Sequence, residues 1–323
     1  MSKDLEALEQ QWLAYEVNKA ALGNIADPQV GALQPLTITA LANADTFCWH
    51  PEPIAAVTEA SRTLPDDVMM TDGLFPEAPV MTVPKIVADL VCNELRDRAA
   101  CGWWWFTDPL PIQTCSGPEP VHALLWSHVA GLGTWFSAFV RDSRQGWGAG
   151  DRFYTLPTVS FRWDADLKLT GLPHVMREGY RRANPNGDGG LQRLGIEATV
   201  EASMRLGQFF LAGLVWLNQR VLSTAPAEGT RQVSRQIQRN YHLKRRPGVT
   251  VVHLRRREGT SSQGDGQSGR NYTCRWVVTG HWRNQPYGPA GKKWHRPIWI
   301  DGYVKGPADQ PLRETQKIFS VKH

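Results

Sequence analysis

Residues 3–22 place apolar side chains at a helical spacing and predict an N-terminal helix. The apolar positions fall on one stripe at a 3-4-3 spacing: Leu5, Leu8, Trp12 and Tyr15. One interpretation is that this stripe packs on the protein's own core. The other is a homodimer through the N-terminal helix, joined by a short coiled-coil seam.

The central section alternates β-branched or aromatic runs with Gly, Pro and Asp, a pattern that predicts an antiparallel sheet. Strands are expected at residues 102–106, 110–113, 121–129, 133–141 and 158–163, with a further short strand at 36–41 and helices at 54–62 and 85–98. Trp103, Trp104 and Trp105 cannot line one pocket, because alternate residues of a strand face opposite sides. We therefore interpret these tryptophans as core residues.

A long apolar helix is predicted from Thr199, as its N-cap, to about Ser223. Gly207 and Gly213 each weaken such a helix by about 1 kcal/mol relative to Ala, unless they permit close packing. Its apolar content predicts the main core helix.

Residues 225–229, APAEG, predict a domain boundary, and four strands are expected after it at 249–257, 272–283, 298–305 and 317–322. The sequence therefore predicts an α+β fold, in which an antiparallel sheet with a long core helix is followed by a small basic β-domain. The expected parts are an acidic body at 1–225, a basic helical connector at 226–248 and the β-domain at 249–323.

The charge of the chain is strongly divided. Residues 231–323 hold 19 Lys and Arg against 5 Asp and Glu, a net charge of +14, whereas residues 1–230 hold 17 against 26, a net charge of −9. Clustered cations gain free energy on a phosphate polymer by releasing its condensed counterions, so the asymmetry favours nucleic acid as partner. The alternatives are that the basic part docks on the acidic body, or that it is a solvated surface.

The five cysteines form no CxxC pair, and we interpret them as reduced thiols of a cytoplasmic protein. The N-terminus lacks the apolar core of a signal peptide, and the longest apolar run, 206–217, is too short to cross a membrane, so no membrane partner is expected. The common nucleotide-binding, hydrolase and zinc-protease motifs do not occur, so no cofactor or metal is predicted.

The predicted connector helix carries Arg231, Arg235 and Arg239 on one face and Val233, Ile237 and Tyr241 on another. Such a helix can lie along phosphates while it is docked on its own domain. Further predicted nucleic-acid-binding residues are Lys244, Arg245, Arg246, Arg255, Arg257, Arg275, Trp282, Lys292, Lys293 and Arg296. Trp282 would serve as a stacking surface for bases.

A catalytic interpretation is also open for the C-terminal domain. Its candidate residues are His281, Arg283, His295, Tyr303 and Lys305. A His or Tyr would take the proton of an RNA 2′-hydroxyl, and Arg or Lys would stabilise charge on the phosphate, as in metal-independent ribonuclease toxins. A third interpretation assigns the same residues a structural role.

Three segments of the C-terminal block, WVVTGHWRNQ, HRPIWI and DGYVKGPADQPL, resemble the signature of a widespread family of uncharacterised proteins encoded by actinobacteria and by their phages and plasmids. The resemblance implies no particular activity. It implies a mobile-element setting and supports treating the C-terminal block as one unit.

Together these patterns predict a nucleic-acid-binding protein of a phage, plasmid or host-defence system, which binds through its basic C-terminal third. A metal-independent ribonuclease toxin, and a structural or protein-interaction role such as a virion or scaffold protein, are the alternatives. Whether the protein is an enzyme is left open by the sequence.

Overall fold

The computed structural model of the chain describes about three fifths of the sequence in detail. The described residues are 3–21, 37–65, 68, 74–75, 80–81, 99–114, 117–129, 133–142, 152–155, 161–164, 168–171, 173–174, 177, 191–219, 221–228, 231–241, 243, 246–254, 274–278, 280–289, 292, 294–305, 307 and 310. Among the predicted elements, the helix at 85–98 and the strand at 317–322 lie outside these residues.

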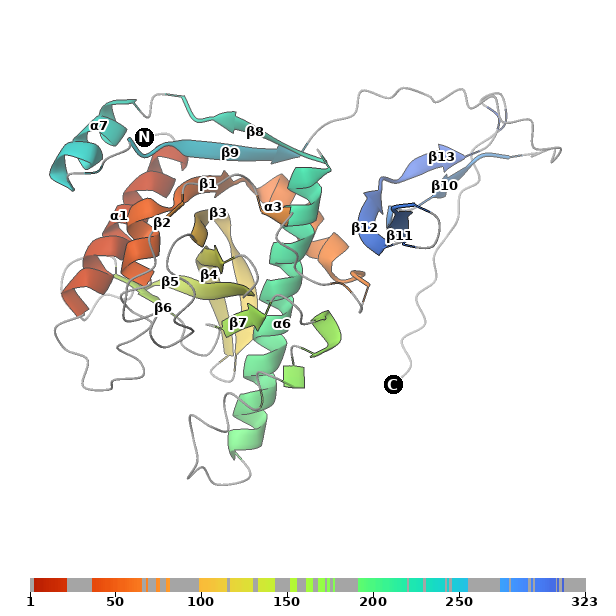
Figure 1. The fold of residues 1–323 in the computed structure, drawn as a ribbon, viewed down its shortest axis with the longest axis horizontal. Helices are drawn as coiled ribbons and strands as arrows, with labels where there is room; N and C mark the ends of the chain where they lie inside the picture. The colour runs from red at the N-terminus through yellow and green to blue at the C-terminus, as the bar shows by residue number, and fades with distance from the viewer. Residues whose placement is uncertain are drawn as a thin grey trace. The chain divides into compact units, whose positions relative to one another are not determined.

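The chain divides into two compact units, residues 1–255 and 256–323. The expected boundary before residue 249 is wrong, because β9 (Val249–Leu254) lies inside the sheet of the first unit, between β1 (Asp45–Trp49) and β8 (Leu222–Pro226). The connector helix, α7 (Arg231–Asn240), also belongs to the first unit and contacts α1 (Lys3–Ala21) (Figure 1).

Nine strands of the described residues form one sheet in the first unit. Its order is β6-β5-β4-β3-β1-β9-β8, with β2 paired to β3 and β7 paired to β5. The remaining bounds are Val80–Met81 for β2, Ala99–Thr114 for β3, Gly117–Val129 for β4, Gly133–Asp142 for β5, Arg152–Thr155 for β6 and Phe161–Asp164 for β7.

The sheet is mixed, which corrects the expectation of a wholly antiparallel one. β1 runs parallel to both β3 and β9, while β3, β4 and β5 pair antiparallel. Parallel neighbours require a crossover connection, and α3 (Pro51–Ser61) follows β1 before the chain returns as β3. The coarse class, a mixture of helices and strands, is as predicted.

Several element boundaries differ from the sequence prediction. The two strands expected at 102–106 and 110–113 are one strand, β3, whose register shifts between Trp105 and Leu110. Residues 37–43 are helical rather than a strand. The long helix, α6 (Leu191–Asn218), begins before Thr199, which lies buried within the helix instead of capping it.

One face of the sheet packs on α6 and α3. The ring centroid of Trp104 lies 4.5 Å from that of Trp49 and 4.6 Å from that of Phe210 on α6. Gly213 allows this approach, because a Cβ atom there would lie only 3.0 Å from Trp104. The glycine therefore permits close packing, the condition under which it was expected to be tolerated in the helix.

The opposite face packs on α1, and the alternation of the three tryptophans follows the prediction. Trp103 and Trp105 join a buried cluster with Leu8 and Trp12, on the side away from Trp104. Gln11, 1% exposed, donates hydrogen bonds to the carbonyls of Leu41 and Ala44 and accepts one from Thr46. These bonds tie α1 to the entry of β1.

The stripe on α1 is thus used inside the chain. Leu8 is 0% and Trp12 4% exposed within a single copy, so neither side chain is available for a coiled-coil seam. The interpretation of this stripe as a homodimer contact is wrong for these two residues, because they pack on the protein's own core.

Candidate functional site

A basic stripe covers the outer face of α7. Arg231, Arg235 and Arg239 are all exposed, at the predicted spacing of one helical turn. They share this surface with Gln232, Gln236 and Asn240. The opposite face of the helix buries Ser234 and Ile237, so the cations are presented to solvent by a helix that is docked through its other side.

The docking of α7 rests on three aromatic rings. Tyr241 stacks on Trp12, with ring centroids 4.5 Å apart, and meets Tyr15 edge to face at 5.5 Å. Burial raises the pKa of the Tyr241 hydroxyl, and the charge of Glu16 and a hydrogen bond to its carboxylate act in the same direction. The C-terminal end of α7 is therefore fixed to α1.

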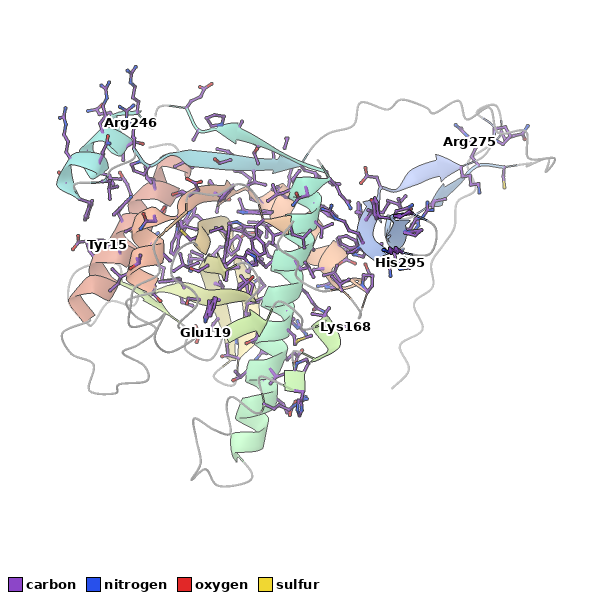
Figure 2. The ribbon with its side chains drawn as sticks, in the orientation of Figure 1. Tyr15, Glu119, Lys168, Arg246, Arg275 and His295 are labelled. Carbon is purple, nitrogen blue, oxygen red and sulfur yellow. The ribbon has the colours of Figure 1, made fainter. Side chains whose placement is uncertain are left out.

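The basic surface continues beyond the helix. Arg246 is exposed and lies at the same end of the first unit as α7 (Figure 2). Residues 231–246 contain six Lys and Arg and no Asp or Glu. Of the six, Lys244 and Arg245 lie outside the described residues. Among the residues that are described, none of the three stripe arginines forms a salt bridge.

In the second unit, four short strands form one hairpin. β10 (Trp276–Val278) pairs with β13 (Tyr303–Lys305), and β11 (His281–Tyr287) pairs with β12 (Trp294–Ile300). Both ladders follow a single register. Trp276 lies opposite Lys305. Five residues later on the first strand, His281 lies opposite Ile300, which is five residues before Lys305 on the second. The described part of this unit is thus a long two-stranded hairpin, interrupted once.

The register assigns each residue of β11 and β12 to one of two faces, because residues directly opposite each other share a face and neighbours along a strand alternate. One face holds His281, Arg283, Gln285 and Tyr287, together with their partners Trp294, Arg296, Ile298 and Ile300. The other face holds Trp282, Asn284, Pro286, His295, Pro297 and Trp299.

This register separates the candidate catalytic residues. His295 lies opposite Pro286, five positions along the ladder from His281, which corresponds to about 17 Å. The two histidines also fall on opposite faces. A general base and a general acid must reach one substrate at the same time, so the hairpin does not bring these histidines together for that purpose.

The other members of the catalytic set are also spread along the hairpin. Arg283 shares the face of His281, two positions away. Lys305 and Tyr303 lie on β13, paired with Trp276 and Val278 beyond the interruption of the ladder. The backbone positions of the set therefore extend along the hairpin on both sides of the interruption.

The remaining predicted binding residues have varied surroundings. Arg275 is half-buried, and its Nε donates a hydrogen bond to the carbonyl of Gln310 at 2.7 Å, which gives it a structural role. Lys292 is exposed near the turn of the hairpin, and Arg296 is half-buried on β12. Figure 2 shows Arg275 and His295 at different ends of the hairpin. Arg255, Arg257 and Lys293 lie outside the described residues.

Trp282 does not have the surroundings expected of a stacking surface. Its ring meets that of Trp299 edge to face, with centroids 5.2 Å apart, and both side chains are half-buried. Tyr287, which the sequence analysis did not single out, is the exposed aromatic side chain on the described part of the hairpin, at 38%. Its position directly before Gly288 at the turn was the available signal.

In the described part of the chain, no group of three or more His, Cys, Asp or Glu side chains is arranged to hold a metal ion. None of the helices there combines the length and apolar character that a bilayer crossing needs. A scan of the sequence against models of known protein families finds no match, and a search of curated proteins finds no significant relative.

Proposed function

We propose that the protein binds nucleic acid through the exposed cations of its C-terminal third, in a phage, plasmid or host-defence setting. The observation that carries the proposal is the stripe of Arg231, Arg235 and Arg239 on a helix whose other face is docked on the body. The setting rests on the resemblance of the C-terminal segments.

Electrostatics supports this proposal over a purely structural role for α7. Like charges at i, i+4 destabilise a helix by about 0.2–0.5 kcal/mol per pair, and the stripe contains two such pairs, Arg231 with Arg235 and Arg235 with Arg239. A bound phosphate backbone removes this repulsion and releases its counterions. Because the helix is already docked by Tyr241 and Trp12, little conformational entropy is lost on binding.

The positions of the described residues also bear on two alternatives, docking of the basic part on the acidic body and a ribonuclease. Docking of the basic part on the acidic body would require acidic partners for the stripe, and within the described residues Arg231, Arg235 and Arg239 form no ion pair. The ribonuclease alternative draws on a set of residues that includes both His281 and His295, and the hairpin register places these two on opposite faces, so they do not act on one phosphodiester together. Nucleic-acid binding needs neither condition.

The experiment is fluorescence anisotropy of the purified full chain with labelled single-stranded RNA, single-stranded DNA and duplex DNA, at about 50 and about 200 mM salt. The test variant replaces all three stripe arginines: Arg231→Gln, Arg235→Gln and Arg239→Gln. The matched control replaces their uncharged neighbours on the same surface: Gln232→Ala, Gln236→Ala and Asn240→Ala.

Wild type and control are expected to bind with a steep dependence on salt. Loss of three phosphate contacts lowers the slope of log K against log salt by about 2.7 for duplex DNA, so the arginine variant binds more weakly and less salt-dependently. Absence of salt-sensitive binding to all three nucleic acids would overturn the proposal and direct the search to a protein partner. Cleavage of the RNA without metal would instead favour the ribonuclease.

A further inference from the structure

An exposed aromatic ring lies at the turn end of the hairpin in the second unit. Tyr287 is the last residue of β11 and keeps 38% of its surface exposed. The next residue, Gly288, has a φ of 94°, a left-handed conformation that Gly adopts at little cost, and there the chain turns towards β12. A single exposed tyrosine is ordinary by itself, so its neighbours decide what it can do.

Two of the other residues on this face, Arg283 and Arg296, are cationic, and the residue directly opposite Tyr287 is Trp294. Gln285, the next residue along this face, lies directly opposite Arg296, and Arg283 follows two positions later. Diagonal neighbours on one face of an antiparallel pair lie about 7–8 Å apart, within reach of long side chains. The ring of Tyr287 is thus followed by Arg296 and Arg283 along one face. His281, also exposed, completes this set of four residues, which we call the Tyr287 face.

The opposite face has no comparable arrangement. The indole of Trp282 packs edge to face on Trp299, and a Cβ atom at Gly280 would lie 2.5 Å from the Trp299 ring. These tryptophans are engaged with each other and with the backbone at the interruption of the ladder. The wider second unit is basic, with 12 Lys and Arg against 5 Asp and Glu in residues 256–323.

We infer that the Tyr287 face is a binding site for single-stranded nucleic acid, in which a base stacks on Tyr287 and the adjoining phosphates lie along Arg296 and Arg283. Stacking on a side chain requires a base whose own face is uncovered, and single strands offer such bases whereas an intact duplex does not. This inference rests on the proposed function and names the ligand class of a second site, separate from the stripe on α7.

The test compares variants of the full chain on a labelled oligonucleotide of about 20 nucleotides and on the duplex of the same sequence, by fluorescence anisotropy. Tyr287→Ala removes the ring, and Tyr287→Phe retains it. Asn284→Ala is the matched control, because Asn284 is an exposed residue on the other face of the same strand.

Tyr287→Ala is expected to weaken single-strand binding about 5- to 150-fold, the range found when a stacking residue is removed. Tyr287→Phe and Asn284→Ala stay within about twofold of wild type. Duplex binding is unchanged in all three variants. The double variant Arg283→Gln and Arg296→Gln is an independent test. It is expected to lower the slope of log K against log salt for single-strand binding by about 1.4.

Two results would overturn the inference. One is a Tyr287→Ala protein that binds single strands as wild type does, and the other is a loss of the same size on single strand and duplex. Both leave the proposed function standing, because the stripe on α7 would still bind duplex. A wild-type chain that binds neither ligand would instead remove the proposed function itself. If Tyr287→Ala fails to fold, the Arg283→Gln and Arg296→Gln variant decides alone. The inference is overturned if this variant binds single strands with the same dependence on salt as wild type.

Discussion

Tyr241, directly after α7, stacks on Trp12 of α1, with ring centroids 4.5 Å apart and ring planes 24° apart. This contact joins residues at opposite ends of the first unit's sequence and fixes the helix that carries the basic stripe. The cations of α7 are therefore positioned by an aromatic contact that none of them takes part in.

Removal of the Tyr241 ring should release α7 without changing its charge. We expect Tyr241→Ala to lower the free energy of unfolding by about 1–3 kcal/mol, because it removes a partly buried aromatic residue and its stacking partner. Urea denaturation measures this loss. Hydrogen exchange of residues 231–240 should accelerate more than that of β3, since the helix loses its anchor first.

Tyr241→Phe is the matched control for this change. It retains the stack on Trp12 and removes only the hydroxyl that donates to Glu16, so exchange in α7 should remain close to wild type. Equal protection of α7 in Tyr241→Ala and in wild type would show that the buried Ile237 and Ser234 are sufficient to hold the helix.

A second prediction concerns the close approach of β3 and β4. Gly102 lies directly opposite Trp126, whose indole crosses the glycine, and a Cβ atom at residue 102 would lie 2.5 Å from the ring. Gly102→Ala should therefore destabilise the protein by about 1–3 kcal/mol through overpacking. Urea denaturation gives the size of the effect.

Gly248, directly before β9, provides the control. A Cβ atom there meets no other atom within 4 Å, so Gly248→Ala should be neutral or stabilise by about 0.4–1 kcal/mol through the unfolded state. If both alanine variants show the same change in free energy, Trp126 is not responsible for the effect at residue 102.

The core was largely predictable from the sequence, because it depends on local alternation. Period-two patterning placed Trp104 on one side of β3 and Trp103 and Trp105 on the other, as the packing shows. Strand order depends on pairing between distant segments, which such a pattern does not encode. For this reason Val251, which pairs with Cys48 some 200 residues earlier, was assigned to the wrong unit.

The candidate site was likewise predictable only where it depends on local sequence. The spacing of Arg231, Arg235 and Arg239 predicted the stripe on α7, since one helix positions all three. The hairpin residues depend on the register between two strands. That register placed His281 and His295 on opposite faces and exposed Tyr287, and the sequence alone gave no register.

A third prediction follows from His122, which lies on β4 between charged groups. Burial lowers the pKa of His122 below its usual value, and the charge of Arg141 adds to this, while a backbone hydrogen bond at Pro120 and the charge of Glu6 oppose it. Arg141 in turn pairs with Glu6 of α1 at 3.2 Å. The neutral imidazole is thus favoured in the folded protein.

Because its folded-state pKa is lowered, His122 supports stability above about pH 6.5, and this contribution is lost as the pH falls below that value. The unfolded chain takes up the proton first. We expect the free energy of unfolding to fall between about pH 7.5 and pH 5.5, and to fall less in His122→Gln. A pH dependence identical in the two proteins would assign the acid sensitivity to other groups.

The final prediction separates charge from hydrogen-bond geometry on α7. Phosphate contacts without base recognition depend on positive charge and counterion release, whereas bidentate recognition depends on the planar guanidinium. Replacing Arg231, Arg235 and Arg239 together by Lys retains the charge and removes the guanidinium, and all three side chains are exposed, so neither substitution disturbs the core. If α7 contacts only the phosphate backbone, the Lys variant should keep the salt slope of wild type and an affinity for duplex DNA within a few-fold, whereas the Gln variant loses both. Anisotropy titrations over a salt series measure the two quantities. A Lys variant as weak as the Gln variant would mean that the guanidinium groups form directed hydrogen bonds, and that the stripe recognises more than charge.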